Sequence, residues 1–400
     1  MSRQQEPKWL AEQPDNILSW QTLSASISPA APIEPGAVVC DFFRARLKKA
    51  LSVPNNTLPA TVDFTVEREW KSKDGVAGQL ISYPSVIPGP RIQAYVLRPA
   101  DVTGPLPGVL ALHCHGNFKP LGKEKIADCE NEPLPEVAIY RQRGYEGRAY
   151  ANELAKQGFI VMVPDAFLWG SRALTRNIVP SFFADVGIKM GDHQRFRSKL
   201  PPGENYESMA SQLAEDNAFE PYVDSFLRTL GTSLAAVVNL DDRTSVRVLK
   251  RISGVKNPDS LSAIGLSGGG NRVGLLMATE PMVKVGVIAG MMSTYENLRA
   301  SGKWWMHSTL LYPPPVPGAP PWEWPDIVGS HAGIKKLLCL DNDEDPLFTQ
   351  DGQESARKRL AELYSFAGKP QDFEAKRYPG HHKLDCQMQE EAFSFLKKHA

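Results

Sequence analysis

Hydrophobic and polar positions follow two different patterns along the chain, and the change between them divides it. Residues 63–71, 78–83 and 91–98 have the short mixed pattern that is typical of antiparallel strands. From residue 108 onward the strands become uninterrupted apolar runs, at 108–113 and 159–163, with a predicted helix over 146–157 that Gly158 ends. Because strands that are apolar throughout must be covered on both faces, this βαβ unit predicts a parallel sheet.

Strands and helices continue to alternate up to the end of the chain, which predicts an α/β fold with a doubly wound, mostly parallel sheet. The later strands are expected at residues 261–264, 283–288, 335–340 and 373–378. The later helices are expected over 222–252, directly after residue 269, and over 352–366 and 386–398.

The remaining segments suggest how the chain is organised. Residues 1–60 are expected to form an N-terminal extension with a helix over 36–51, and residues 61–400 the α/β domain. Residues 174–219 form a long polar stretch with several Phe, which suggests a cap or lid. Residues 301–326 form a Pro-rich loop with Trp304, Trp305, Trp322 and Trp324. Loops of this length in a compact domain are usually functional or disordered.

The most informative motif lies between a predicted strand and a predicted helix. The pentapeptide Gly265-Leu266-Ser267-Gly268-Gly269 has the G-x-S-x-G pattern, in which a serine is held on a sharp turn from strand to helix. Small neighbours are needed there because the backbone on either side approaches closely. Ser267 is therefore the candidate nucleophile.

A serine hydroxyl is a weak nucleophile unless a base accepts its proton and an acid orients that base. Both partners follow later strands, in the order Ser, Asp, His. The strand at 335–340 is followed by Asp341, Asp343 and Asp345, and the strand at 373–378 by His381 and His382. The spacing alone leaves the choice open among the acids and between the two histidines.

With these motifs the chain resembles the α/β-hydrolase superfamily, and within it the acetyl xylan esterase and dienelactone hydrolase-like branch. The resemblance extends over residues 90–400. It rests on the serine pentapeptide, Asp345-Pro346-Leu347-Phe348, Pro379-Gly380-His381-His382 and His113-Cys114-His115-Gly116-Asn117. It implies a serine carboxylesterase that works through an acyl-enzyme, with Ser267 as nucleophile, His382 as base and Asp345 as acid.

The resemblance also implies an oxyanion hole built from the backbone N–H of Gly268 and one from Gly116 or Asn117. No metal or organic cofactor is expected. His113 and His115, at i and i+2, are expected to share one face of a strand and could ligate a metal, but a third ligand at recognisable spacing is missing. A role in the oxyanion-side loop is therefore favoured. His115, Trp304 and Trp305 are candidate substrate-binding residues.

Composition excludes some classes of partner. The formal net charge is zero and no basic patch stands out, which argues against nucleic acid. No apolar run reaches the ~20 residues that a bilayer span needs. The polar start lacks the apolar core of a signal peptide, and the five scattered cysteines suggest no disulfide framework, so a cytoplasmic location is expected.

The expected partner is a small-molecule ester, and the Phe and Trp residues of the inserts suit a bulky or hydrophobic group on it. Two alternatives stay open. The same site would also serve acyl transfer, or cleavage of a C–C or peptide bond. In an alternative of another class, the chain is a catalytically silent α/β-hydrolase scaffold that binds a small molecule or a partner.

Overall fold

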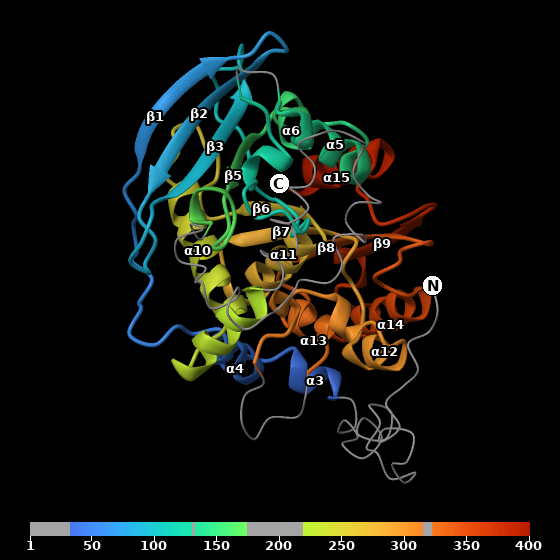
Figure 1. The fold of residues 1–400 in the computed structure, drawn as a ribbon. Coiled ribbons are helices and arrows are strands. Elements are labelled where there is room, and N and C mark those ends of the chain that lie inside the picture. Colours follow the sequence, from blue (N-terminus) through green and yellow to red (C-terminus); the bar gives the residue numbers. More distant parts are fainter. Residues whose placement is uncertain (1–32, 130–132, 174–218, 315–321) are drawn as a thin grey trace, which may run out of the picture.

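A single nine-stranded sheet, in the order β1-β2-β3-β5-β4-β6-β7-β8-β9, forms the centre of the protein (Figure 1). The computed structural model describes residues 33–129, 133–173, 219–314 and 322–400. Strands β1, β2 and β3 pair antiparallel, β3 also runs antiparallel to β5, and the strands from β5 to β9 are parallel. The strands are β1 (Thr65–Lys71), β2 (Val76–Tyr83), β3 (Ile92–Pro99), β4 (Gly108–Leu112), β5 (Ile160–Pro164), β6 (Leu261–Leu266), β7 (Val283–Ala289), β8 (Lys336–Asn342) and β9 (Phe373–Tyr378).

Helices cover both faces of the sheet. In Figure 1, α5 (Pro135–Tyr145), α6 (Tyr150–Lys156) and α15 (Cys386–His399) lie on one face. The opposite face is covered by α10, α11, α13 and α14, with α3, α4 and α12 at the periphery. These helices are α3 (Pro35–Val38), α4 (Asp41–Ala50), α10 (Leu234–Leu249), α11 (Gly268–Thr279), α12 (Tyr295–Ala300), α13 (Trp324–Gly329) and α14 (Gln350–Phe366).

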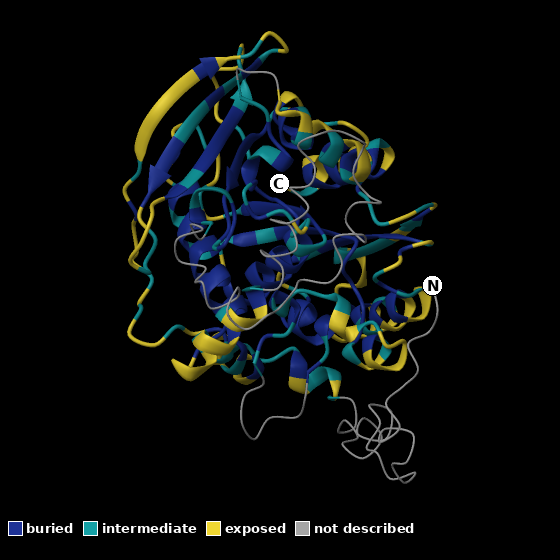
Figure 2. Ribbon diagram, viewed as in Figure 1, coloured by how far each residue is buried: buried dark blue, intermediate teal, exposed yellow. Residues whose placement is uncertain are grey.

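The central strands supply side chains to both layers of the core. In β4, Val109 and Ala111 pack with α6 and α15, while Leu110 and Leu112 pack with α10 and α11. Because successive side chains point to opposite faces of a strand, a strand covered on both sides must be apolar at every position. Figure 2 shows the contrast with β1 at the edge of the sheet, where only Trp70 is buried.

The doubly wound, mostly parallel α/β sheet predicted from the sequence is confirmed, with differences at several helices. The helix expected over 146–157 begins at Tyr150, because Glu146 and Gly147 both adopt positive φ and end the preceding helix α5. The helix expected over 222–252 is interrupted: one helix covers 219–229, Gly231 turns with a φ of 78°, and Ser233 caps α10.

The N-terminal helix is also divided, into α3 and α4. The Sγ atom of Cys40 accepts the N–H of Phe43 and starts α4. Phe43, Leu47 and Leu51 are buried, whereas Phe42 is 68% exposed. Phe43 packs edge-on against Trp322, with ring centroids 5.8 Å apart, so this part of the predicted extension rests on the main core.

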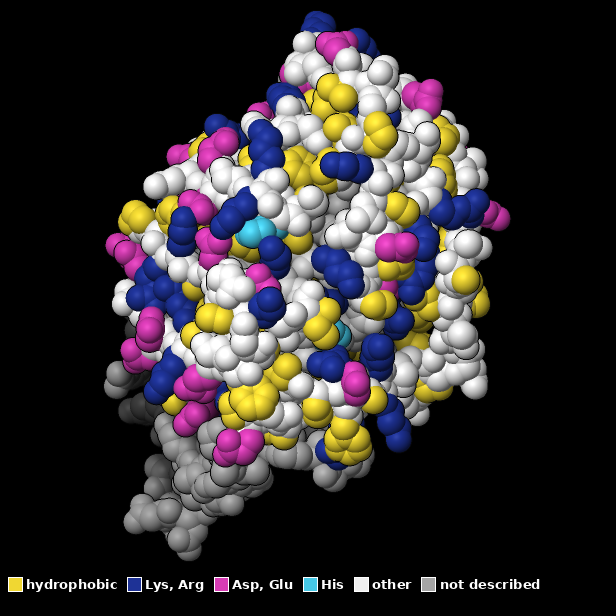
Figure 3. Space-filling view, turned by 180° about the vertical axis from the view of Figure 1, so that it is seen from behind, with side chains coloured by type: hydrophobic (Ala, Val, Ile, Leu, Met, Phe, Trp, Pro, Cys, Tyr) yellow, Lys and Arg dark blue, Asp and Glu magenta, His cyan; other side chains and the backbone are white. Residues whose placement is uncertain are grey.

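The division of the chain at residue 60 stays a prediction. The suggested cap, residues 174–219, lies outside the described residues except for its last position. The Pro-rich loop over 301–326 is described apart from 315–321. None of the described helices is long and apolar enough to cross a membrane. Basic and acidic side chains are interspersed over the face drawn in Figure 3.

Candidate active site

The carboxyl ends of the parallel strands bring the candidate residues to one edge of the sheet. Ser267 follows β6, Asp345 lies just beyond β8, and His382 lies just beyond β9. The loop that begins at His113 leaves β4, the neighbour of β6. In open α/β sheets this edge is where ligands bind.

Ser267 lies on the sharp turn that the motif predicts. Its φ of 56° and ψ of −119° are unfavourable for a residue with a side chain. The glycines are needed for space: a Cβ added at Gly265 would lie 2.4 Å from the carbonyl carbon of Gly269, and one added at Gly269 would lie 2.1 Å from the carbonyl oxygen of Leu112. The N–H of Ser267 donates to the carbonyl of Ala289, at 2.8 Å, which ties the turn to the end of β7.

His382 and Asp345 form a hydrogen-bonded pair, with 2.7 Å between Nδ1 and Oδ2. The Asp345 side chain is fully buried, and its other oxygen accepts the N–H groups of Leu347 and Phe348, at 2.8 and 3.3 Å. In a neutral imidazole, this hydrogen bond to a carboxylate places the proton on Nδ1 and leaves Nε2 as an acceptor. This is the tautomer that a general base needs.

The imidazole of His382 lies beside the serine turn. A Cβ added at Gly290, directly after β7, would lie 3.1 Å from Cε1 of His382 and 2.9 Å from Cδ1 of Leu266, the residue before Ser267. Gly290 therefore borders both the His382 ring and the serine turn, and any larger residue there would displace one of them.

The alternative candidates from the sequence, His381, Asp341 and Asp343, contact other groups. The His381 side chain is 82% exposed, and its Nδ1 lies 3.4 Å from the carbonyl of Glu344. Asp341 forms an ion pair with Arg357 at 2.9 Å, and burial raises the pKa of Asp341 to about 6. Asp343 accepts the N–H of Gly380 at 2.8 Å. Asp341 and Asp343 thus hold the strand ends and loops in place, and only Asp345 contacts a histidine of the pair.

The oxyanion-side loop packs directly against the residue after the serine. A Cβ added at Gly268 would lie 2.8 Å from the backbone nitrogen of His115. Gly268 is the first residue of α11, so its N–H has no acceptor within the helix. The N–H of Asn117 donates to Nδ1 of His115 at 3.1 Å, whereas the N–H of Gly116 has no acceptor in the part of the chain that the structure describes. Of the two candidate donors, Asn117 is the one whose N–H is engaged by His115.

Comparison with solved structures supports this architecture. No protein-family model matches the chain, and no curated protein is similar to it in sequence. A protein assigned as an acetyl xylan esterase from Bacteroides fragilis superposes with a TM-score of 0.60 at 14% identity, over 90% of this chain and 82% of that one. A glucuronoyl esterase from Solibacter usitatus superposes with a TM-score of 0.57 at 12% identity, over 93% of this chain and 94% of that one. A promiscuous CE15 esterase from a marine bacterial metagenome superposes with a TM-score of 0.56 at 12% identity, over 94% of this chain and 98% of that one.

The chain has the α/β-hydrolase fold. At these identities the comparison establishes the fold and not the substrate. Within this fold the loop after β4 begins at His113, so His113 and His115 lie beyond the strand and not on it.

The ring nitrogens of both histidines are occupied by hydrogen bonds. His113 accepts the N–H of Ala166 at Nε2 and contacts the carbonyl of Cys114 through Nδ1, at 3.1 and 3.0 Å. Burial lowers the pKa of His113 well below its usual value, so the ring is neutral. His115 contacts Glu220 through Nε2 at 2.8 Å. Among the described residues no group of three or more His, Cys, Asp or Glu is placed to hold a metal ion.

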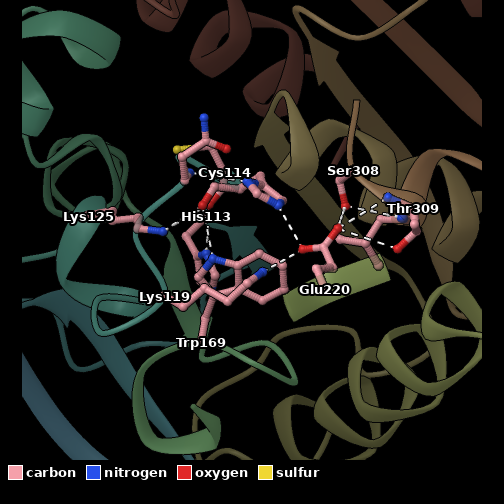
Figure 4. A network of polar contacts seen from close by, with 11 residues as sticks. His113, Cys114, Lys119, Lys125, Trp169, Glu220, Ser308 and Thr309 are labelled. Atoms are coloured by element: carbon pink, nitrogen blue, oxygen red, sulfur yellow. Dashed lines mark hydrogen bonds and ion pairs between the residues drawn. The ribbon is translucent and has the colours of Figure 1, made fainter. Parts of the chain in front are cut away.

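Glu220 is the centre of a buried polar network that the sequence did not predict (Figure 4). Its carboxylate contacts His115, Lys119, Ser308 and Thr309, which come from segments far apart in the chain. Burial opposes ionisation of Glu220, but Lys119 and His115 outweigh it and hold its pKa well below the usual range. The network joins the oxyanion-side loop to the 301–314 segment. No local motif marks it, because each contact depends on the tertiary fold.

The 301–314 segment reaches the site through His307, which the sequence analysis did not single out. Trp304 and Trp305 of the same segment are 36% and 60% exposed. The ring of His307 lies 4.7 Å from that of Phe348, which stacks on His382 at 6.2 Å. Burial lowers the pKa of His307 to about 4, so it is neutral near pH 7, and its Nε2 is buried without a hydrogen-bond partner in the described residues. The role suggested for the two tryptophans in substrate binding stays a prediction.

Proposed function

We propose that the protein is a serine carboxylesterase in which Ser267, His382 and Asp345 form the catalytic triad. The observation that carries the proposal is the strained serine turn beside the His382–Asp345 pair. Unfavourable backbone conformations persist where the surrounding structure enforces them, and they are concentrated at functional sites. A silent scaffold has no need of the strained serine, the buried carboxylate and the imidazole bonded to it together.

The reaction follows from the roles of these groups. Ser267 Oγ attacks the ester carbonyl carbon while Nε2 of His382 accepts the hydroxyl proton. The N–H groups of Gly268 and Gly116 stabilise the oxyanion of the tetrahedral intermediate. Collapse of that intermediate breaks the bond to the alkoxy oxygen, and His382 donates its proton to the departing alcohol. Water then attacks the acyl-enzyme with His382 again as base, which releases the acid and regenerates Ser267.

A labelling experiment with a matched variant tests the proposal. A fluorophosphonate probe should label the wild-type protein at Ser267 and should not label Ser267→Ala. The variant should fold normally, because alanine is smaller than serine, and its kcat on an activated ester should fall by on the order of 10⁴ or more. An unlabelled wild-type protein that binds esters without turning them over would instead support the scaffold alternative.

The substrate is best approached with a series of chromogenic esters of increasing acyl length. Two of the structural neighbours are described as an acetyl xylan esterase and a glucuronoyl esterase, so acetylated xylan and sugar uronate esters belong in the same series. Hydrolysis of short acyl groups only would indicate a small acyl pocket. A preference for long or aromatic groups would indicate that the insert at 301–326 leaves room for bulk.

A further inference from the structure

The peptide group between His115 and Gly116 is held in an unusual way. Its carbonyl oxygen accepts two hydrogen bonds from buried side chains, one from Nζ of Lys125 and one from Nε1 of Trp169, each at 2.9 Å. Figure 4 shows Lys125 and Trp169 approaching this loop from different segments. The same peptide group carries the N–H of Gly116, the second oxyanion donor of the proposed function.

Lys125 is costly to bury. Its side chain is fully buried, and within the described residues no carboxylate lies within ion-pair distance of Nζ. Among the described residues, Nζ of Lys125 donates to the carbonyl of His115 at 2.9 Å and to that of Cys114 at 3.4 Å. Burial lowers the pKa of Lys125 to about 7, which reflects the cost of keeping the charge away from water. The nearby Lys119 differs, because its charge is paired with Glu220.

The two donors act on the N–H at the opposite end of the peptide group. The described backbone contains no cis peptide bond, so the N–H of Gly116 points away from the carbonyl of His115. Two hydrogen bonds on the oxygen fix the peptide plane. When Nζ of Lys125 is protonated, its charge beside the same oxygen also draws electron density from the nitrogen, which makes the N–H a stronger donor, as in other polarised hydrogen-bond chains.

We propose that Lys125, together with Trp169, is a positioning residue of the oxyanion hole, which fixes and polarises the His115–Gly116 peptide so that the Gly116 N–H stabilises the oxyanion formed at Ser267. The inference rests on the proposed esterase function. Lys125 touches no reacting atom and acts through the peptide group.

Lys335 provides a matched control. It is also fully buried, burial also lowers its pKa to about 7, and its Nζ also donates to backbone carbonyls, those of Met277 and Glu280, each at 2.7 Å. These carbonyls lie at the C-terminal end of α11, whereas Ser267 precedes the N-terminal end. Lys335→Met therefore removes an equivalent buried ammonium far from the reaction.

The test compares Lys125→Met with Lys335→Met by steady-state kinetics on one activated ester and by thermal unfolding. Lys125→Met should lower kcat by about 10-fold to 10²-fold with little change in KM, because deleting a whole oxyanion donor costs about 10²-fold to 10³-fold and weakening one costs less. Lys335→Met should lower the melting temperature but keep kcat within about twofold. Equal kcat for the two folded variants would overturn the inference.

Two further measurements keep the test decisive. If Lys125→Met fails to fold, Trp169→Phe removes one of the two donors while keeping a ring, and should lower kcat several-fold. Hydrogen–deuterium exchange of residues 113–118 should rise in the Lys125 or Trp169 variant and stay unchanged in Lys335→Met. Unchanged exchange would refute the positioning role even if the protein were not an esterase, whereas an unlabelled wild-type Ser267 would refute the proposed function alone.

Discussion

The two sides of Ser267 are built in different ways. On the acid–base side, Asp345 comes from the loop after β8 and His382 from the loop after the neighbouring strand β9, and one hydrogen bond joins them. On the oxyanion side, the loop at 113–117 is held by Lys125, Trp169 and Glu220, which come from segments separated in the chain. The first side depends on a few residues, while the second depends on a buried network of charged and polar groups.

This difference indicates how each side should respond to substitution. His382 forms one side-chain hydrogen bond and Asp345→Asn keeps an acceptor oxygen, so substitutions in the acid–base pair should lower turnover steeply and cost the fold less. A residue of the oxyanion side carries charge in the interior, so its loss should lower both stability and rate.

The largest effect is expected at His382. His382→Ala should lower kcat by on the order of 10⁴ or more, because no other group in the proposed triad accepts the proton of Ser267. His381→Ala should keep most of the activity, since that side chain points to solvent. The measurement is kcat of the two variants on one activated ester. If His381→Ala were the inactive variant, the proposed pair would be wrong.

Replacing the acid should have the next largest effect. Asp345→Asn should lower kcat by on the order of 10³, because an amide can stabilise the wrong tautomer of His382. Asp343→Asn and Asp341→Asn should act weakly on kcat, since these carboxylates contact Gly380 and Arg357. The same ester assay measures all three variants. A greater loss of rate in Asp343→Asn than in Asp345→Asn would contradict the assignment.

On the oxyanion side, Glu220→Gln should lower kcat by about 10-fold and also destabilise the protein. The substitution removes the carboxylate charge from the buried pair with Lys119, and breaking such a pair typically costs about 3–5 kcal/mol. Denaturant unfolding and kcat should be measured together. Glu390→Gln, which removes an exposed pair with Arg148, serves as control and should cost at most about 1 kcal/mol. Full stability in Glu220→Gln would argue against the network.

His113 should make stability depend on pH. Its pKa is lower in the folded protein than in the unfolded chain, where it is near 6.5, so its contribution is fully present above about pH 6.5 and is lost as the pH falls. The slope for one such group is at most about 1.4 kcal/mol per pH unit. Urea unfolding at pH 7 and pH 5.5 should show a smaller pH effect in His113→Gln than in the wild type.

The smallest effect is expected at the exposed tryptophans. Trp305→Ala should change the ratio of kcat/KM between bulky and small esters several-fold with little change in melting temperature, because the side chain is mostly exposed. Trp322→Ala is the contrast: that side chain is buried against Phe43, so the variant should lose about 3–5 kcal/mol of stability and show no change in preference. An unchanged ratio in Trp305→Ala would remove it from the substrate site.

The sequence by itself determined the alternation of strands and helices and the order of Ser267, the acids and the histidines along the chain. Both follow from local patterns: apolar runs mark strands covered on both faces, and the serine motif needs small residues at defined positions. Helix α5 was not predicted because one position of its buried face is Arg141, whose Nη1 and Nη2 atoms donate to Asp128 and to the carbonyls of Glu124 and Ala127.

Only the tertiary structure decided which of these side chains contact one another. Asp345 and not Asp341 faces a histidine because the chain turns after β8, and adjacent side chains such as His381 and His382 then point to different surroundings. The contacts of Glu220 with His115 and of Trp169 with the same loop join residues 105 and 54 positions apart. Buried polar groups must find partners wherever the fold supplies them, and no local periodicity records that pairing.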